Sequence, residues 1–130
     1  MSQLRIFLGN PDRDGRLGLQ MLLEHEPGMR IVGISVRSVG LVGQVGAAQP
    51  DVLLLDWQLV ASAPVEFIRN LHSIESQPFI IVTHIHPETK QKAAATGADA
   101  FFCKDGPPDP LLMILQKLRR KRLQEQETKE

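Results

Sequence analysis

The sequence predicts an α/β fold in which helices cover both faces of a five-stranded parallel sheet. Two observations support this doubly wound architecture. Five short apolar segments alternate along the chain with longer segments that are compatible with helices. The apolar segments are hydrophobic throughout, as in "VLLL" at residues 52–55, which is typical of strands buried on both faces. Repeated strand–helix units with right-handed crossovers then place the strands in parallel.

Each predicted strand is a run of four to six mainly apolar residues, and the intervals between the strands each leave room for one helix. The predicted strands are Leu4–Gly9, Arg30–Ser35, Asp51–Asp56, Phe79–Thr83 and Ala100–Cys103.

The predicted helices occupy the segments near Arg13–Glu26, Val39–Gln49, Pro64–Ser73 and Pro87–Thr96, and a last helix runs from about Pro110 to Glu125. The sequence "EPG" ends the first of them. Glycines in "GLVGQVG" predict a weak or irregular second helix, because each costs about 1 kcal/mol relative to alanine. Gly97 suits the C-terminus of the fourth helix. Asp109 suits the N-cap of the last predicted helix, and Pro110 suits its first turn. The basic run "KLRRKR" is typical of a solvated helix end.

The composition excludes several classes of function. Lys and Arg total 15, as do Asp and Glu, so no net field favours nucleic acid or an anionic membrane. A single cysteine, Cys103, excludes an internal disulfide and fits a reducing compartment. Apolar runs are too short to span a membrane, and "MSQLRIFLGN" does not resemble a signal peptide. We therefore expect a cytoplasmic domain that binds neither membrane nor nucleic acid directly.

Three polar residues stand where predicted strands end. Asp56 ends the third strand, Thr83 ends the fourth, and Lys104 follows the fifth. Ligands of open α/β sheets bind outside the carboxyl ends of the strands. There an aspartate can accept a phosphoryl group, while a lysine and a threonine hydroxyl can bind its oxygens.

With these residues in place, the chain resembles the receiver domain of two-component response regulators, particularly those joined to a LuxR/NarL-type DNA-binding domain. The matching stretches are "LGLQMLLEHEPGMRIVG", "PDVLLLDW", "FIIVT" and "GADAFFCKDGPPDPLL". The resemblance implies a flavodoxin/CheY-like (βα)5 fold with strand order 2-1-3-4-5. It implies that Asp56 is the phosphoacceptor, that Thr83 and Lys104 contact the phosphoryl group, and that Phe101 is the switch aromatic.

The resemblance fails at the metal site. Receiver domains end their first strand with two acids that hold magnesium, whereas this chain has Asn10 and Pro11. Asp12 follows one residue later, and the Gln58 region can add a backbone carbonyl. Magnesium prefers anionic oxygens in octahedral geometry. We therefore expect a degenerate metal site at Asn10, Pro11, Asp12 and Gln58, no bound cofactor, and at most weak magnesium binding.

Two further positions differ from the receiver pattern. His84 follows the switch threonine where a small residue usually leaves room for the phosphoryl group, and Pro64 replaces a usual glycine. Two alternatives follow for Asp56. It accepts phosphate with little help from metal, or it is a structural residue paired with Lys104 in a domain that signals through protein contacts.

We expect a regulatory module at residues 1–125 and a polar tail at 126–130, without enzymatic turnover. The expected partner is a histidine kinase or another signalling protein. A homodimer would use the predicted fourth helix, fifth strand and last helix, with Lys90 and Lys92, or the first and last helices. The alternative is a flavodoxin-like cofactor binder or enzyme on the same topology. It needs a phosphate-binding loop, and "GNPDRDG" is a poor one because Pro11 lacks a backbone donor.

Overall fold

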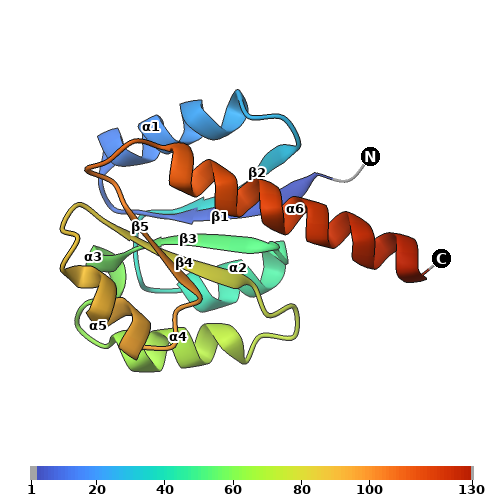
Figure 1. Ribbon diagram of the computed structural model, residues 1–130. Helices are drawn as coiled ribbons and strands as arrows, with labels where there is room; N and C mark the ends of the chain where they lie inside the picture. The colour runs from blue at the N-terminus through green and yellow to red at the C-terminus, as the bar shows by residue number, and fades with distance from the viewer. Residues whose placement is uncertain (1–2, 130) are drawn as a thin grey trace.

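A single five-stranded sheet forms the centre of the protein, whose computed structural model describes residues 3–129 (Figure 1). All strand pairs are parallel and the order is β2-β1-β3-β4-β5. The strands are β1 (Leu4–Gly9), β2 (Met29–Ser35), β3 (Val52–Asp56), β4 (Phe79–His84) and β5 (Ala100–Cys103). The predicted fold class is therefore confirmed, and the predicted strand bounds agree to within one residue.

Within the described residues, six helices connect and follow the strands. They are α1 (Arg13–Glu24), α2 (Leu41–Ala48), α3 (Trp57–Val60), α4 (Pro64–His72), α5 (Thr89–Ala95) and α6 (Asp109–Lys129). The single turn α3 was not expected, and α6 continues past Glu125, where the last helix was expected to end. Asp109 is the first residue of α6 instead of its N-cap. Within residues 3–129, no helix combines the length and the apolar character needed to cross a membrane.

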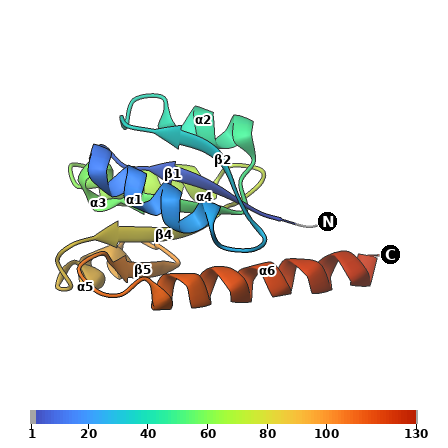
Figure 2. The ribbon, with the colours of Figure 1, turned by 90° about the horizontal axis from the view of Figure 1, so that it is seen from above.

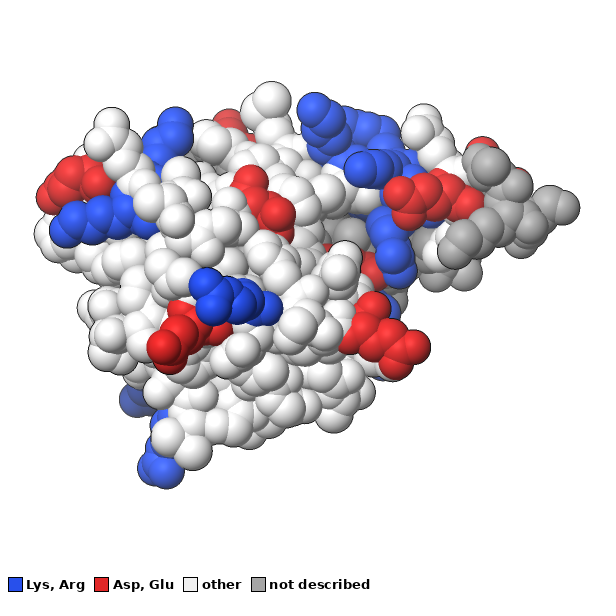
Figure 3. Space-filling view, turned by 90° about the horizontal axis from the view of Figure 1, so that it is seen from below, with Lys and Arg blue, Asp and Glu red and all other residues white. Residues whose placement is uncertain are grey.

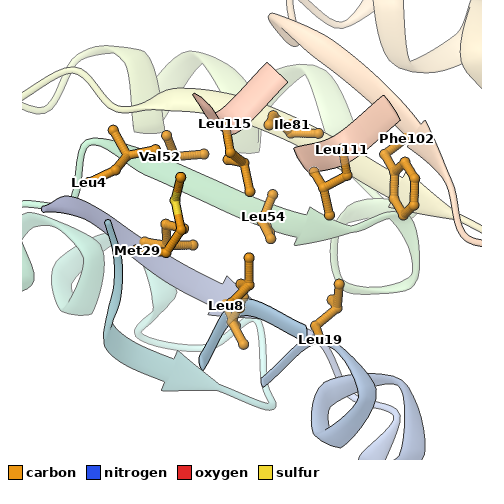
Figure 4. Packing of buried hydrophobic residues seen from close by; sticks show 12 residues of the cluster. Leu4, Leu8, Leu19, Met29, Val52, Leu54, Ile81, Phe102, Leu111 and Leu115 are labelled. Carbon is orange, nitrogen blue, oxygen red and sulfur yellow. The ribbon is translucent and has the colours of Figure 1, made fainter. Parts of the chain in front are cut away.

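The helices form a layer on each side of the sheet (Figure 1), and each layer buries its own hydrophobic cluster. On one side, α1 and α6 contribute leucines that pack on β1, β3 and β4 (Figure 4); these are Leu19, Leu23, Leu111 and Leu115. The other side is covered by α2, α3, α4 and α5. Alternate residues of β3 enter the two clusters, so Leu54 faces one and Leu55 the other. This arrangement explains the unbroken apolar run of β3.

The second helix differs from its expectation, because α2 is short but regular. Its buried side chains Leu41 and Val45 have no exposed surface and pack in the cluster beneath it. Burial of each such side chain stabilises by about 1.5–3 kcal/mol, so the two together outweigh the helix-propensity cost of two glycines, about 1 kcal/mol each. Gly40 lies outside the helix as its N-cap, with a left-handed φ of 78°.

Two glycines of this segment should respond oppositely to alanine. A Cβ added at Gly43 or at Gly40 would meet no atom within 4 Å, so neither substitution causes a clash. Gly43→Ala in the helix interior should raise the free energy of unfolding by about 0.5–1 kcal/mol. Gly40→Ala should lower it by about 1 kcal/mol, because a Cβ disfavours the left-handed backbone. Urea denaturation measures both values, and equal effects of the two variants would contradict this account.

Candidate functional site

The parallel register brings the predicted site residues to one edge of the sheet. Asp56 at the end of β3 is paired with Thr83 of β4. Lys104 follows β5, and its backbone N–H donates to the His84 carbonyl at 2.8 Å. β1 ends at Gly9, the residue before Asn10, and Gly9 is paired with Leu55, the residue before Asp56. The carboxyl ends of four strands therefore contribute to a common edge.

Asp56 is the centre of this site. Its side chain is 1% exposed, and both carboxylate oxygens have protein partners. Oδ1 accepts the backbone N–H of Gln58 at 2.9 Å. Oδ2 accepts from Lys104 Nζ at 2.5 Å and, more weakly, from the Thr83 hydroxyl at 3.5 Å. The structure thus brings together the predicted acceptor, lysine and threonine, and it pairs the buried charge as its burial requires.

Asp56 also begins the unexpected helix α3. Its extended backbone (φ −69°, ψ 136°) and its bond to the Gln58 N–H make it an N-cap. An aspartate placed after a buried strand is therefore used twice, as a helix cap through one oxygen and as the partner of Lys104 through the other. The N-cap role of Asp56 was not predicted from the sequence, although an aspartate before a possible turn of helix is the signal of an N-cap.

The orientation of the Asn10 amide is set by the loop that follows it. Asn10 is 1% exposed, and its Oδ1 accepts the backbone N–H of Asp12 at 2.8 Å. Its Nδ2 is buried, with no hydrogen-bond partner among the described residues. The oxygen that could bind a cation is therefore turned toward the backbone, and a hydrogen-bond donor takes the opposite side.

Three further oxygens of this loop also accept hydrogen bonds from protein groups. The Asp12 carboxylate accepts the Gly15 N–H at 2.9 Å and caps α1. The Arg16 guanidinium donates to the backbone carbonyls of Asn10 and Pro11, at 3.1 Å each. The positive charge of Arg16 thus lies against the loop in which receiver domains hold their metal.

Gly15 forms part of the wall of the site. A Cβ added there would lie 3.0 Å from Asp12 Oδ2, 3.2 Å from Asn10 Nδ2 and 3.7 Å from Lys104 Nζ. These three polar groups therefore surround one point at the first turn of α1. Two of the three carry hydrogen-bond donors.

The donor set matches magnesium poorly. Mg²⁺ requires hard, preferably anionic oxygens in octahedral geometry. Asp56 and Asp12 both use their carboxylates in protein hydrogen bonds, and Asn10 presents its NH₂ group. Among the described residues, no group of three or more His, Cys, Asp or Glu side chains is placed to hold a metal ion.

His84 links the site to α5. Its Nδ1 lies 2.9 Å from the buried Thr89 hydroxyl, and its ring packs edge-on against His86 at 4.9 Å. Burial lowers the pKa of His84 below its usual value; the Asp56 carboxylate opposes this shift, while Lys104 adds to it. The neutral imidazole is therefore the favoured form in the folded protein.

The lowered pKa of His84 predicts an acid-sensitive contribution to stability. The unfolded chain binds this proton more readily, so stability is lost as pH falls below about 6.5 and through the folded-state pKa. In His84→Asn, whose amide can keep the bond to Thr89, the part of the acid-induced loss of stability that comes from His84 should be absent. Urea denaturation between about pH 7 and pH 5 measures it. Identical pH profiles for the two proteins would contradict the prediction.

Two other predicted positions lie apart from the Asp56 carboxylate. Phe101 is partly buried and packs against the cluster beneath α2–α5. Pro64 is the first residue of α4, a position that suits proline, and the peptide bonds of the described chain are all trans. Neither residue is among the hydrogen-bond partners of Asp56.

The fold is the CheY-like fold of receiver domains, with its sheet order and helices on both faces. A two-component response regulator of the LuxR family from Aurantimonas sp. SI85-9A1 superposes with a TM-score of 0.79 and 21% identity, covering 92% of this chain and 87% of that one. The receiver domain of sensor histidine kinase PA1611 from Pseudomonas aeruginosa PAO1, which coordinates magnesium in its active-site cleft, superposes with a TM-score of 0.75 and 16% identity. That match covers 90% of this chain and 98% of the PA1611 domain.

One relative is similar in sequence. It is the DNA-binding transcriptional activator DevR/DosR of Mycobacterium tuberculosis, which is 29% identical over 104 residues. The match covers 78% of this chain and 48% of the relative, so the chain spans about half the length of that protein. No family model matches the chain.

Proposed function

We propose that this chain is an atypical response-regulator receiver domain of bacterial signal transduction. The observation that carries the proposal is the bonded group of Asp56, Lys104 and Thr83 at the carboxyl edge of a receiver-type sheet. Each of the three comes from a different strand or from the loop after it. Packing alone does not require this combination of residue types.

In this proposal, magnesium-dependent phosphorylation of Asp56 is impaired or absent. The charge that develops on a transferring phosphoryl group needs a strong electrostatic stabiliser, usually the metal ion. Here the acidic pair is replaced, and the Asn10 amide presents a donor. Asp56 itself is 1% exposed and held by Lys104, so a phosphodonor can reach it only after this pair opens.

The domain would then act as a regulatory module without enzymatic turnover, through contacts with a histidine kinase or another signalling protein in the cytoplasm. DNA binding belongs to the DevR/DosR relative; for this chain we propose no direct contact with nucleic acid.

We propose self-association through one of two faces. The first combines α5, where Lys90 and Lys92 are exposed, with β5 and α6. The second combines α1 and α6, where Met21 and Met113 are 63% and 71% exposed.

Incubation with acetyl phosphate and magnesium tests the state of Asp56. We expect no phosphorylated species on a phosphate-affinity gel, and the same pattern for Asp56→Asn. Partner binding and self-association, measured by sedimentation, should be unchanged in Asp56→Asn because its amide can keep the Gln58 hydrogen bond. A phosphorylated band that vanishes in Asp56→Asn would show that the site works as in other receivers. A visible flavin absorption of the purified protein would instead support the flavodoxin-like alternative.

A further inference from the structure

A group of arginines converges at the opposite end of the sheet from Asp56. They line a cavity of about 310 Å³ where β1 and β2 begin, beneath the C-terminal half of α6. Arg5 comes from β1, Arg30 from β2, and Arg119 and Arg122 from α6; Asp51 lies before β3. Figures 1 and 2 both show α6 extending to this end of the molecule, where the chain enters β1. We call these four arginines the arginine cluster.

The lining of this cavity is predominantly basic. Four arginines and one aspartate line it, which leaves a formal charge of 4 − 1 = +3. Asp51 is already engaged, since its Oδ1 pairs with Arg122 Nη2 at 2.5 Å and its Oδ2 accepts the Arg5 backbone N–H at 2.8 Å. One carboxylate thus fixes α6 to the start of the sheet and offsets a single guanidinium.

The other three arginines differ in how their side chains are held. Arg5 donates its side chain to the carbonyls of Ala48 and Gln49, at 2.7 and 3.4 Å, and these neutral partners hold it in place. Arg30 is exposed, and within the described residues its side chain has no hydrogen bond or ion pair. Arg119 lies directly over Gly28, where its guanidinium occupies the space of a Cβ. The cluster therefore combines held guanidinium groups with one that is free to move onto a ligand.

A neighbouring hollow differs in character. Its volume is about 530 Å³, and it shares Leu4, Asp51 and Arg122 with the first cavity. Its further lining carries charges of both signs, among them Asp99, Lys121 and Glu125. On the face seen in Figure 3, acidic and basic side chains lie close together near the end of α6.

We propose that the arginine cluster binds a small anion with two or more phosphate groups. Guanidinium forks match phosphate oxygens in a bidentate geometry, and the cavity lies in the size range of small-molecule sites. The ligand would bridge β1 and β2 to α6, because Arg5 and Arg30 lie on the sheet and Arg119 and Arg122 on the helix. Sequence analysis treated "KLRRKR" as a solvated helix end; the strand arginines beside it support a binding site.

Isothermal titration with pyrophosphate, in potassium chloride at physiological ionic strength, tests the proposal. We expect saturable binding to the full chain and a loss of about tenfold in affinity for Arg30→Gln, which removes one charge-assisted phosphate contact. Because the Arg30 side chain makes no hydrogen bond or ion pair within the described residues, this variant should fold normally. Arg37→Gln is the matched control: it removes the same charge just past the other end of β2 and should bind as the wild type does. No saturable binding, or equal affinities of the two variants, would overturn the proposal.

Discussion

Lys104→Ala should lower the free energy of unfolding by about 3 kcal/mol, the largest effect expected from one substitution at the site. The variant leaves the Asp56 carboxylate buried, with the Gln58 N–H and the long Thr83 bond as its remaining partners. A buried charge that loses its counterion keeps its desolvation cost and loses the attraction that offset it. Urea denaturation followed by Trp57 fluorescence measures the loss.

The double variant Asp56→Asn/Lys104→Ala separates charge from packing. Asparagine has nearly the shape of aspartate and is an equally good N-cap, so α3 should remain. Because the unpaired charge is gone, the double variant should regain most of the free energy of unfolding that Lys104→Ala loses. If the two variants are equally unstable, the lysine stabilises through its aliphatic stem and the electrostatic account is wrong.

The sheet and the centre of the site could be predicted because they follow from short-range patterns and one topological rule. Unbroken apolar runs such as that of β3 mark strands that are covered on both faces. In a parallel sheet, the residues that end these strands must meet at one edge. Asp56, Thr83 and Lys104 were therefore placed together before any distance was known, and the structure confirms it.

Other features depend on contacts that no local pattern contains. The four-residue α3 is too short to show a helical period, and its formation depends on the Asp56 cap. The regularity of α2 depends on burial of Leu41 and Val45 beneath its glycines. The direction of the Asn10 amide is set by one backbone N–H of the loop.

The arginine cluster shows the same limit over a longer range. Arg5 and Arg30 are separated from Arg119 by most of the chain, and only the packing of α6 across the sheet brings them to one cavity. A basic run on a helix surface is usually solvated, so the run itself carried no signal of a site.

Magnesium should leave the fluorescence of the wild-type protein unchanged up to low-millimolar concentrations, and beryllofluoride should form no stable complex. Trp57 is the sole tryptophan, it follows Asp56 directly, and the chain has no tyrosine, so its emission reports on this site alone. A bound ion would have to share the Asp56 carboxylate with Lys104 and the Gln58 N–H, and the Asn10 amide would have to turn its oxygen away from the Asp12 N–H. Neither change is favoured for an ion that dehydrates reluctantly.

The double substitution Asn10→Asp/Pro11→Asp makes this prediction decisive. It supplies the two carboxylates of the receiver pattern and removes the donor that Asn10 presents, so magnesium should now change Trp57 emission along a saturable curve. Lys104 is unchanged in this variant, so its pairing with Asp56 should be kept. A saturable response of the wild type would show that Asp12 or another group has taken over the role of the missing acids. Flat titrations of both proteins would mean that His84, and not the loss of the two acids, prevents magnesium binding. Adding His84→Ala to the double variant should then produce a saturable curve.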